Sequence, residues 1–368
     1  MAMDTVFSPS FGNRPTCLVG RDSVIDRFMH GLETRPGNRS RTTVLLGQRG
    51  SGKTVLLWEL ADRAEAQGFV VAKPTVVSEN MLERVVEKIQ ENGERYVDQK
   101  HPRISGGSIG ALGFSAGLQF THEVEQAKSS SFKLTQLVRE LSSQGHGTLI
   151  LVDELQANSA PVRQLVITYQ ELVGEGLDVA LAMAGLPGAV SATLNDRVLT
   201  FLNRAQKVTL DSLEIGDVDA FYDRAFRSMG IQMDPKTRLA AAQSTQGSPY
   251  LLQLLGHNIA VRADRNTPVT KELVREAEHA SRIDFENDVC ATSVAALSEM
   301  DVKFLAAMTQ DDGDSRMADI SSRLEVTGDY AQKYRRRLID AGIIRATGRG
   351  RVAFAVPYLR SYLGRKDE

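Results

Sequence analysis

Apolar and polar residues alternate along the chain in blocks that predict strands and helices in turn. Runs of apolar and β-branched residues predict five buried strands, at residues 42–46, 68–77, 148–155, 178–185 and 207–210. Apolar residues at helical spacing predict the main helices between them, at residues 55–67, 79–97, 128–143 and 161–173. This repeated order of strand and helix favours a parallel sheet with helices on its two faces.

The turn between the first strand and its helix carries the clearest chemical signal. Residues 47–54 read GQRGSGKT and fit the pattern G-x-x-x-x-G-K-[ST] without a mismatch. Glycines keep side chains out of the way of a triphosphate, so loop N–H groups and the helix N-terminus can bind its negative charge. The predicted nucleotide contacts in this stretch are Gly47, Gly50, Ser51, Gly52, Lys53, Thr54 and Val55.

Two acidic residues lie near the end of the strand at 148–155, which reads TLILVDEL. Lys53 is expected to reach the β- and γ-phosphates of ATP, and Thr54 and Asp153 are expected to hold Mg²⁺ from opposite sides. Glu154 is then in position to orient or deprotonate the attacking water. The alternative for the acidic pair is an ordinary polar strand end. The predicted cofactors are therefore ATP and Mg²⁺.

The segment before the first strand predicts one helix. Residues 8–15 are rich in Ser, Gly and Asn and indicate an irregular lead-in. Asp22 or Ser23 can cap a helix that starts near Val24, and residues 35–41 predict a polar loop. The turn before this helix, Gly20-Arg21-Asp22, indicates by itself only a helix N-terminus.

Residues 101–120 form an unusual insertion in the predicted sheet domain. Five glycines stand among apolar residues in this stretch, which is too many for a stable helix. We expect a Gly-rich hairpin or ordered loop. Two roles remain open for it: a structural hairpin on the domain surface, or a contact surface for a neighbouring subunit, nucleic acid or membrane.

The order of these motifs resembles the AAA+ superfamily of P-loop ATPases. The resemblance spans residues 15–285 and is carried by GRD, GQRGSGKT, LILVDEL, ALAMAGLP, FLNRAQKVTL and GSPYLL. Within that superfamily the chain looks most like the signal-transduction ATPases with numerous domains (STAND) and the archaeal origin-recognition initiator ATPases. The resemblance implies that Gly20 and Arg21 cover the adenine. It also implies that Arg204, or else Arg197, reaches the γ-phosphate of a neighbouring subunit, although either can be an ordinary surface arginine.

Two departures from the AAA+ pattern bear on hydrolysis. The fourth strand of AAA+ proteins normally ends in a polar residue that orients the water, whereas residues 183–185 read MAG. The usual lid arginine is replaced by residues 247–250, GSPY, which resemble the GxP motif of the STAND group. Neither departure argues against nucleotide binding. We therefore expect a slow switch rather than a motor.

Residues 214–280 predict short helices separated by Gly and Pro turns, as in the helical lid that closes over the nucleotide in AAA+ proteins. Pro249 and Tyr250 are the lid residues expected to contact the nucleotide. The alternative for this part of the lid is plain helical packing, for which Tyr250 and Leu251 are equally suitable.

Residues 298–363 have the size and pattern of a winged helix, with three helices followed by a hairpin. Between residues 327 and 352, seven basic side chains stand against two acidic ones. Arginines on a recognition helix and a wing suit phosphate and major-groove contacts. The expected contacts to double-stranded DNA are Lys333, Arg335, Arg336, Arg337 and Arg349. The alternatives are a protein contact and a passive solvated face.

Composition and charge limit these functional predictions only slightly. The 368-residue chain has a net charge of −2, so a local patch rather than the whole molecule suits nucleic acid. Cys17 and Cys290 fit no metal or redox spacing and indicate a reducing compartment. The sequence shows neither a signal peptide nor an apolar run long enough to span a membrane, which predicts a cytoplasmic protein.

The predicted fold is α/β: a three-layer P-loop NTPase (AAA+) domain with a helical lid, followed by an α+β winged-helix domain. The expected divisions are a lead-in with the adenine-side helix at 1–40, the nucleotide domain at 41–212, the lid at 213–285 and the winged helix at 290–368.

The predicted function is an ATP-binding switch, an ATPase of low turnover that requires Mg²⁺. Its winged helix is expected to couple nucleotide binding to DNA, and ATP binding is expected to allow homo-oligomers. The alternative is a signalling or defence ATPase scaffold whose winged helix and insertion at 101–120 bind proteins rather than DNA.

Overall fold

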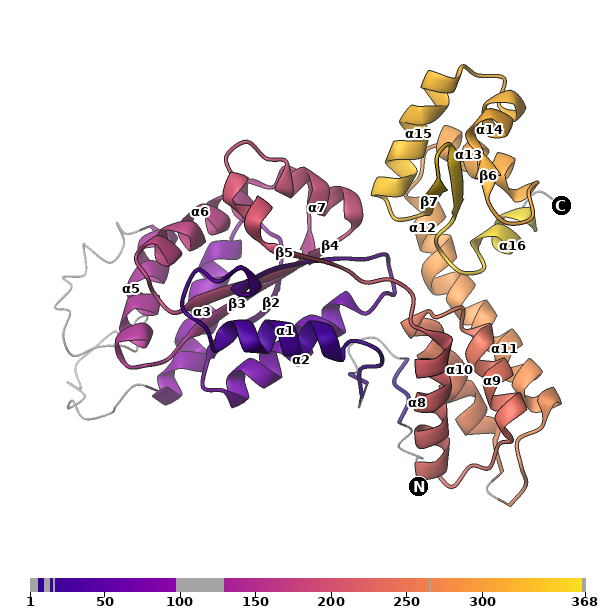
Figure 1. Cartoon of the computed structure of the whole chain (residues 1–368), viewed down its shortest axis with the longest axis horizontal. Coiled ribbons are helices and arrows are strands. Elements are labelled where there is room, and N and C mark those ends of the chain that lie inside the picture. The colour runs from indigo at the N-terminus through magenta and orange to yellow at the C-terminus, as the bar shows by residue number, and fades with distance from the viewer. Residues whose placement is uncertain (1–5, 10–13, 16, 97–128, 265, 366–368) are drawn as a thin grey trace.

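The structure, a computed structural model, describes residues 6–9, 14–15, 17–96, 129–264 and 266–365. The Gly-rich stretch at 101–120 lies outside the described residues. The chain first forms a parallel sheet covered by helices (Figure 1). A bundle of helices follows, and then a smaller domain of helices with a three-stranded sheet.

Five parallel strands form the first sheet, in the order β2-β3-β4-β1-β5. They are β1 (Thr42–Leu46), β2 (Val70–Val76), β3 (Thr148–Leu155), β4 (Val179–Gly185) and β5 (Gln206–Thr209). β2 runs through Pro74, where its pairing with β3 shifts register between Ala72 and Thr75. β4 lies between β1 and β3, as an AAA+-type sheet requires.

Helices cover both faces of this sheet, so its strands are buried and apolar on both sides. The helices are α1 (Asp22–Leu32), α2 (Lys53–Ala66), α3 (Met81–Gly93), α5 (Ser130–Ser143), α6 (Ala160–Gly174) and α7 (Pro187–Leu194). Short 3₁₀ turns occur at Arg39–Arg41, Glu94–Tyr96 and Thr200–Arg204. One apolar core packs α1 and α2 on one face, and another packs α3, α5 and α6 on the opposite face.

One prediction about the segment before the sheet was wrong. α1 begins at Asp22, and its N-cap residue is Arg21, which makes no side-chain capping bond. Neither Asp22 nor Ser23 therefore caps the helix.

The polar connection at 35–41 ends in a buried arginine. Arg41 is only 2% exposed and donates hydrogen bonds to the carbonyls of Gly31, Leu32 and Thr34. It also pairs with Asp178. These bonds satisfy carbonyls at the end of α1 that have no partner within the helix.

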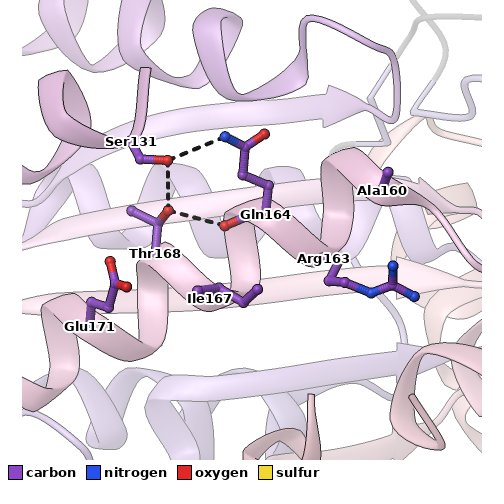
Figure 2. A pocket seen from close by; sticks show the side chains of 7 residues that line it. All are labelled: Ser131, Ala160, Arg163, Gln164, Ile167, Thr168 and Glu171. Carbon is purple, nitrogen blue, oxygen red and sulfur yellow. Dashed lines mark hydrogen bonds between the residues drawn. The ribbon is translucent and has the colours of Figure 1, made fainter. Parts of the chain in front are cut away.

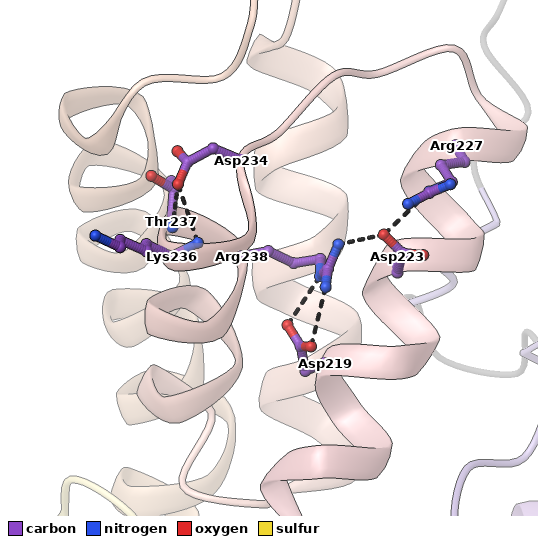
Figure 3. A network of polar contacts seen from close by, with 7 residues as sticks. All are labelled: Asp219, Asp223, Arg227, Asp234, Lys236, Thr237 and Arg238. Atoms are coloured by element: carbon purple, nitrogen blue, oxygen red, sulfur yellow. Dashed lines mark hydrogen bonds and ion pairs between the residues drawn. The ribbon is translucent and has the colours of Figure 1, made fainter.

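A bundle of four helices follows the sheet: α8 (Ile215–Ser228), α9 (Pro235–Ser244), α10 (Pro249–Arg262) and α11 (Lys271–Phe285). Arg238 of α9 binds two carboxylates of α8, donating to Asp219 through Nε at 2.8 Å and pairing with Asp223 (Figure 3). This charged link between α8 and α9 adds to an apolar core shared by all four helices.

α11 continues through a π-helical turn (Glu286–Ala291) and α12 (Thr292–Ala295) into the C-terminal domain. Its helices are α13 (Glu299–Thr309), α14 (Met317–Arg323), α15 (Gly328–Asp340) and α16 (Leu359–Gly364). Its strands are β6 (Ser315–Arg316), β7 (Ile344–Gly348) and β8 (Arg351–Phe354), antiparallel in the order β6-β8-β7. The order of helices, strand and hairpin is that of a winged helix.

Candidate nucleotide site

The loop between β1 and α2 has the backbone geometry of a phosphate cradle. Gly50 and Gly52 have φ angles of 75° and 86°, which glycine adopts without strain. A Cβ at Gly47 would lie 2.3 Å from Ser51 Oγ, so a larger residue does not fit there. The first turn of α2, which includes the half-buried Val55, directs unpaired backbone N–H groups at this loop.

Lys53 lies over the loop and is held by its carbonyls. Its Nζ donates to Gly47 O at 2.8 Å and to Gln48 O at 2.6 Å. Burial lowers the pKa of Lys53 to about 8, against the opposing effect of Asp153. Among the described residues, the hydrogen-bond acceptors of this partly buried cation are neutral carbonyls, an arrangement that an anionic ligand would improve.

Thr54 and Asp153 meet across the end of the sheet, although they are far apart in sequence. Thr54 Oγ1 donates to Asp153 Oδ2 at 2.6 Å, and Asp153 is 4% exposed. The contact arises because only β4 separates β1 from β3, so their carboxyl ends face the same crevice. A hydroxyl and a carboxylate brought together in this way are oxygen ligands of the type that Mg²⁺ prefers.

Glu154 differs from its neighbour in conformation and in exposure. Its φ angle is 54°, a left-handed conformation that is uncommon outside glycine, and its N–H donates to Asp153 Oδ1 at 2.8 Å. Asp153 is buried, whereas Glu154 is exposed. The two carboxylates are therefore held at different depths at the edge of the sheet.

A buried hydroxyl group in the loop also indicates an anion site. Ser51 Oγ is buried and has no hydrogen-bond partner within the described part of the chain. Buried hydroxyls are normally satisfied, so this oxygen calls for a ligand or an ordered water. Together with Lys53 and with the space left by Gly47 and Gly50, it fits the phosphates of a nucleotide.

The predicted adenine-side turn is connected to the boundary between sheet and lid. Arg21 Nη2 donates to Asp211 O at 2.7 Å, and burial lowers the pKa of Arg21. A Cβ at Gly20, whose φ is 64°, would lie 3.2 Å from Asp217 Oδ2. The turn thus contacts the segment that leads from β5 into α8 and is more than the start of a helix.

The two lid residues predicted to contact the nucleotide lie against the phosphate loop. The Cβ of Tyr250 is 3.4 Å from the Cβ position at Gly50, and the Cβ of Pro249 is 4.0 Å from that at Gly52. The N-terminus of α10 therefore contacts the loop directly.

β4 contributes no polar side chain to the site. Residues 183–185 are buried, and all residues of β4 are apolar. Arg204 ends the 3₁₀ turn at Thr200–Arg204, and Arg197 lies before that turn. Both side chains are exposed, and neither forms an ion pair with any described residue. The structure therefore leaves both arginines accessible to a second molecule.

A pocket of about 320 Å³ lies away from the phosphate loop, between α5 and α6 (Figure 2). Thr168 Oγ1 donates to Ser131 Oγ at 3.1 Å, and Gln164 Nε2 donates to the same oxygen at 3.4 Å. None of its lining residues belongs to the phosphate loop.

The basic residues of the winged helix differ in how they are engaged. Lys333, Arg336 and Arg349 are exposed, whereas Arg335 is partly buried and its Nε has no hydrogen-bond partner among the described residues. Arg337 pairs with the buried carboxylate of Asp301 in α13. The charge of Arg337 is therefore already compensated, a state that the sequence pattern did not predict.

The fold and this loop have the architecture of the P-loop nucleotide-binding class: a parallel sheet, a glycine-rich loop after its first strand and a buried carboxylate at the end of β3.

Comparison with known proteins shows which families and solved structures this chain resembles. Residues 17–180 match the family described as AAA ATPase domain, and residues 287–363 match a domain of unknown function, DUF8462. A search of curated proteins gives no match. Among solved structures, the Walker-type ATPase PABY2304 of Pyrococcus abyssi is 15% identical with a TM-score of 0.67, and the match covers 98% of this chain and 100% of that one.

A second similar structure is the ORC2 protein of Aeropyrum pernix in its ADPNP–ADP complexes. It is 14% identical with a TM-score of 0.64, and the match covers 97% of this chain and 96% of that one. The family match confirms the predicted resemblance to AAA+ P-loop ATPases, and the two solved structures are similar to this chain in fold. They also confirm the predicted fold, an α/β P-loop domain with a helical lid and a C-terminal winged helix. Within the described residues, no helix is long and apolar enough to cross a membrane.

Proposed function

We propose that this protein is an ATP-binding switch with slow Mg²⁺-dependent hydrolysis, coupled to DNA binding through its winged helix. The observation that carries the nucleotide part is the hydrogen bond of 2.6 Å between Thr54 and Asp153, next to the Lys53 ammonium. It joins the two motifs on which such a site depends, and the A. pernix relative was solved with ADPNP and ADP.

Each residue of the site has a role in this proposal. Lys53 and the loop N–H groups bind the β- and γ-phosphates. Thr54 and Asp153 hold Mg²⁺, which when bound neutralises charge on the phosphate oxygens. Glu154 orients a water molecule and accepts its proton. Gly20 and Arg21 on one side, and Pro249 and Tyr250 on the other, flank the base and sugar.

Slow turnover follows from what the site lacks. The apolar end of β4 offers no side chain to orient water, and Pro249 and Tyr250 stand where AAA+ proteins have a lid arginine. We propose that Arg204, with Arg197 as second choice, completes the site of a neighbouring subunit when ATP is bound.

The DNA part of the proposal depends on exposed basic side chains. Lys333 and Arg336 on α15 and Arg349 in the turn of the β7–β8 hairpin are exposed, on an otherwise slightly acidic chain. Side chains of this type bind phosphates and position a recognition helix. The second candidate function is a protein-binding scaffold. It is favoured by Arg337 and Arg351, whose charges are already paired with the carboxylates of Asp301 and Asp314.

Nucleotide binding is tested with Lys53→Ala and Glu154→Gln. Lys53→Ala removes charge-assisted hydrogen bonds and should weaken ATP binding by about tenfold or more, measured by calorimetry. Glu154→Gln should bind ATP like the parent protein and fail to release phosphate. Lys303→Ala, which changes a lysine of the winged-helix domain, is the control. Parental ATP affinity in Lys53→Ala would rule out the site, and parental turnover in Glu154→Gln would remove Glu154 from the reaction.

A further inference from the structure

The winged helix contacts the nucleotide domain at two glycines. A Cβ added to Gly342, which follows α15, would lie 3.3 Å from Gln48 Cγ in the phosphate loop and 3.7 Å from Gln48 Cβ. A Cβ at Gly188 in α7 would lie 2.9 Å from the carbonyl oxygen of Asp340 at the end of α15. Figure 1 shows this end of α15 beside α7. Gly188 is needed for so close an approach, because a Cβ there would overlap Asp340.

The lid contacts the same loop through Tyr250, which also reaches the connection to the winged helix. Its Cβ lies 3.4 Å from the Cβ position at Gly50. Its hydroxyl donates to Asp288 Oδ2 at 2.6 Å, and its ring centroid is 6.0 Å from that of Phe285. Phe285 ends α11, and Asp288 lies in the π-helical turn that follows.

The π-helical turn is the joint between lid and winged helix. Such turns are rare and occur mostly at functional positions. Phe285 also contacts the ring of Tyr358 in the C-terminal domain at 6.2 Å, and the Tyr358 hydroxyl donates to Ser244 O of α9 at 2.9 Å. Movement of Asp288 would therefore be transmitted to the winged helix.

These contacts form a closed ring from the phosphate loop through Tyr250, Asp288 and the winged helix back to the loop at Gln48. In this structure, Lys53 Nζ donates a hydrogen bond to Gln48 O at 2.6 Å. A phosphate that attracts this ammonium removes that bond and changes the loop where Gly342 packs on it. In close-packed protein, such a change must be accommodated by neighbouring contacts.

We propose that Tyr250 and Asp288 are positioning residues that link nucleotide binding at the phosphate loop to docking of the winged helix. Tyr250 follows the position of the loop at Gly50, and Asp288 transmits it to the π-helical turn. This inference rests on the proposed function, because it requires a nucleotide in the loop. Coupling between two equilibria is reciprocal, so undocking the winged helix must also change nucleotide affinity.

Docking can be measured by the rate of disulfide formation between Gln48→Cys and Gly342→Cys. The Cβ separation of 3.7 Å suits a disulfide. The exposed Cys17 is changed to serine, and Cys290 is buried. Because ADP with Mg²⁺ should loosen the contact at Gln48, we expect it to slow disulfide formation about fivefold or more.

The role of Tyr250 and Asp288 is tested by removing either partner of their hydrogen bond. Tyr250→Phe and Asp288→Ala, singly or together, should bring the ratio of rates with and without ADP to about one. Asp288→Asn keeps an oxygen that accepts the Tyr250 hydrogen bond and should retain most of the nucleotide effect. A parental ratio in Tyr250→Phe and Asp288→Ala would overturn the proposal.

The reciprocal effect is measured as the affinity for a fluorescent ADP. Gly188→Ala forces a methyl group against Asp340 and should undock the winged helix. Because ADP disfavours docking, undocking should raise the affinity for ADP, by about fivefold. Gly216→Ala, likewise at the second position of a helix but with open space around it, is the matched control. Parental ADP affinity in Gly188→Ala would also overturn the proposal. Failure of the proposed function is distinct, because the parent protein would then not bind ADP at all.

Discussion

Lys53 illustrates how one buried charge sets the properties of the nucleotide site. A lysine in water has a pKa near 10.4, but burial lowers that of Lys53 to about 8. Its two carbonyl partners stabilise the ammonium less than a phosphate would. A bound phosphate should therefore raise the pKa of Lys53 again, so that nucleotide binding takes up a proton above pH 8.

This proton uptake predicts a pH dependence of nucleotide affinity. Below about pH 7 the lysine is almost fully charged in the free protein, so affinity should not depend on its titration there. Between pH 7 and pH 9 the free protein loses that charge while the complex keeps it, so ADP affinity should fall about tenfold. Calorimetry in buffers of different ionisation enthalpy measures both the affinity and the proton uptake.

Lys53→Arg provides the control for this pH effect. An arginine stays charged throughout this range, so its complex should lose less than about twofold in affinity between pH 7 and pH 9. An equal decline in both proteins would assign the pH effect to another group.

At this scale the sequence predicted the motifs but not the details of their geometry. GQRGSGKT and the Asp153–Glu154 pair are local patterns whose spacing carries their chemistry. The ion pair of the buried Arg41 joins it to Asp178, which is distant in sequence, so no local pattern encodes that pair.

Among the elements, the N-terminal segment contributes more than its irregular sequence indicated. Phe7 is 2% exposed and packs into the lid, with ring centroids 5.8 Å from Phe221 and 5.4 Å from Phe226. Arg14 lies 4.1 Å above the ring of Trp58 in α2 and pairs with Asp62. The segment therefore connects the lid to a helix of the sheet.

Removal of Phe7 should destabilise the lid in particular. Phe7→Ala leaves a cavity among aromatic rings, for which about 3–5 kcal/mol of stability is the usual loss. Relative to the parent protein, Phe7→Ala should speed hydrogen exchange in α8 and α10 more than in the strands of the sheet, as measured by mass spectrometry. Phe132→Ala, at a position 39% exposed on α5, is the control and should leave exchange in α8 unchanged. Uniformly faster exchange would contradict a role confined to the lid.

Whether an element could be predicted depends on its length and on the range of its contacts. Long periodic helices such as α3 and α15 and the strand β3 follow from their own residues within a few positions. β6 has two residues and exists only because β8 pairs with it. The π-helical turn and the anchoring of Phe7 likewise require partners from other parts of the chain.

At the scale of the whole molecule, the question is how much of the winged helix remains available to DNA. The end of α15 is occupied by α7 and the phosphate loop, and Arg337 is occupied by Asp301. Between residues 327 and 352, the exposed basic side chains that form no ion pair with a described residue are Lys333, Arg336, Arg345 and Arg349. DNA binding should therefore depend on this smaller set and not on every basic residue of the domain.

The salt dependence of duplex binding measures this set directly. Each protein–phosphate contact contributes about 0.9 to the slope of log affinity against log salt concentration. Changing Lys333, Arg336 and Arg349 together to alanine should therefore flatten the slope by about two to three units. The measurement is fluorescence anisotropy of a labelled random duplex over a range of salt concentrations.

The control removes the same charge from a different surface. Changing three exposed arginines of the lid, Arg224, Arg227 and Arg275, alters net charge equally but should leave the slope near that of the parent protein. Equal flattening in both triple variants would mean that net charge, rather than a defined face, governs binding. A parent protein with no salt-dependent duplex binding would favour the scaffold function, since the exposed cations would then serve a protein partner.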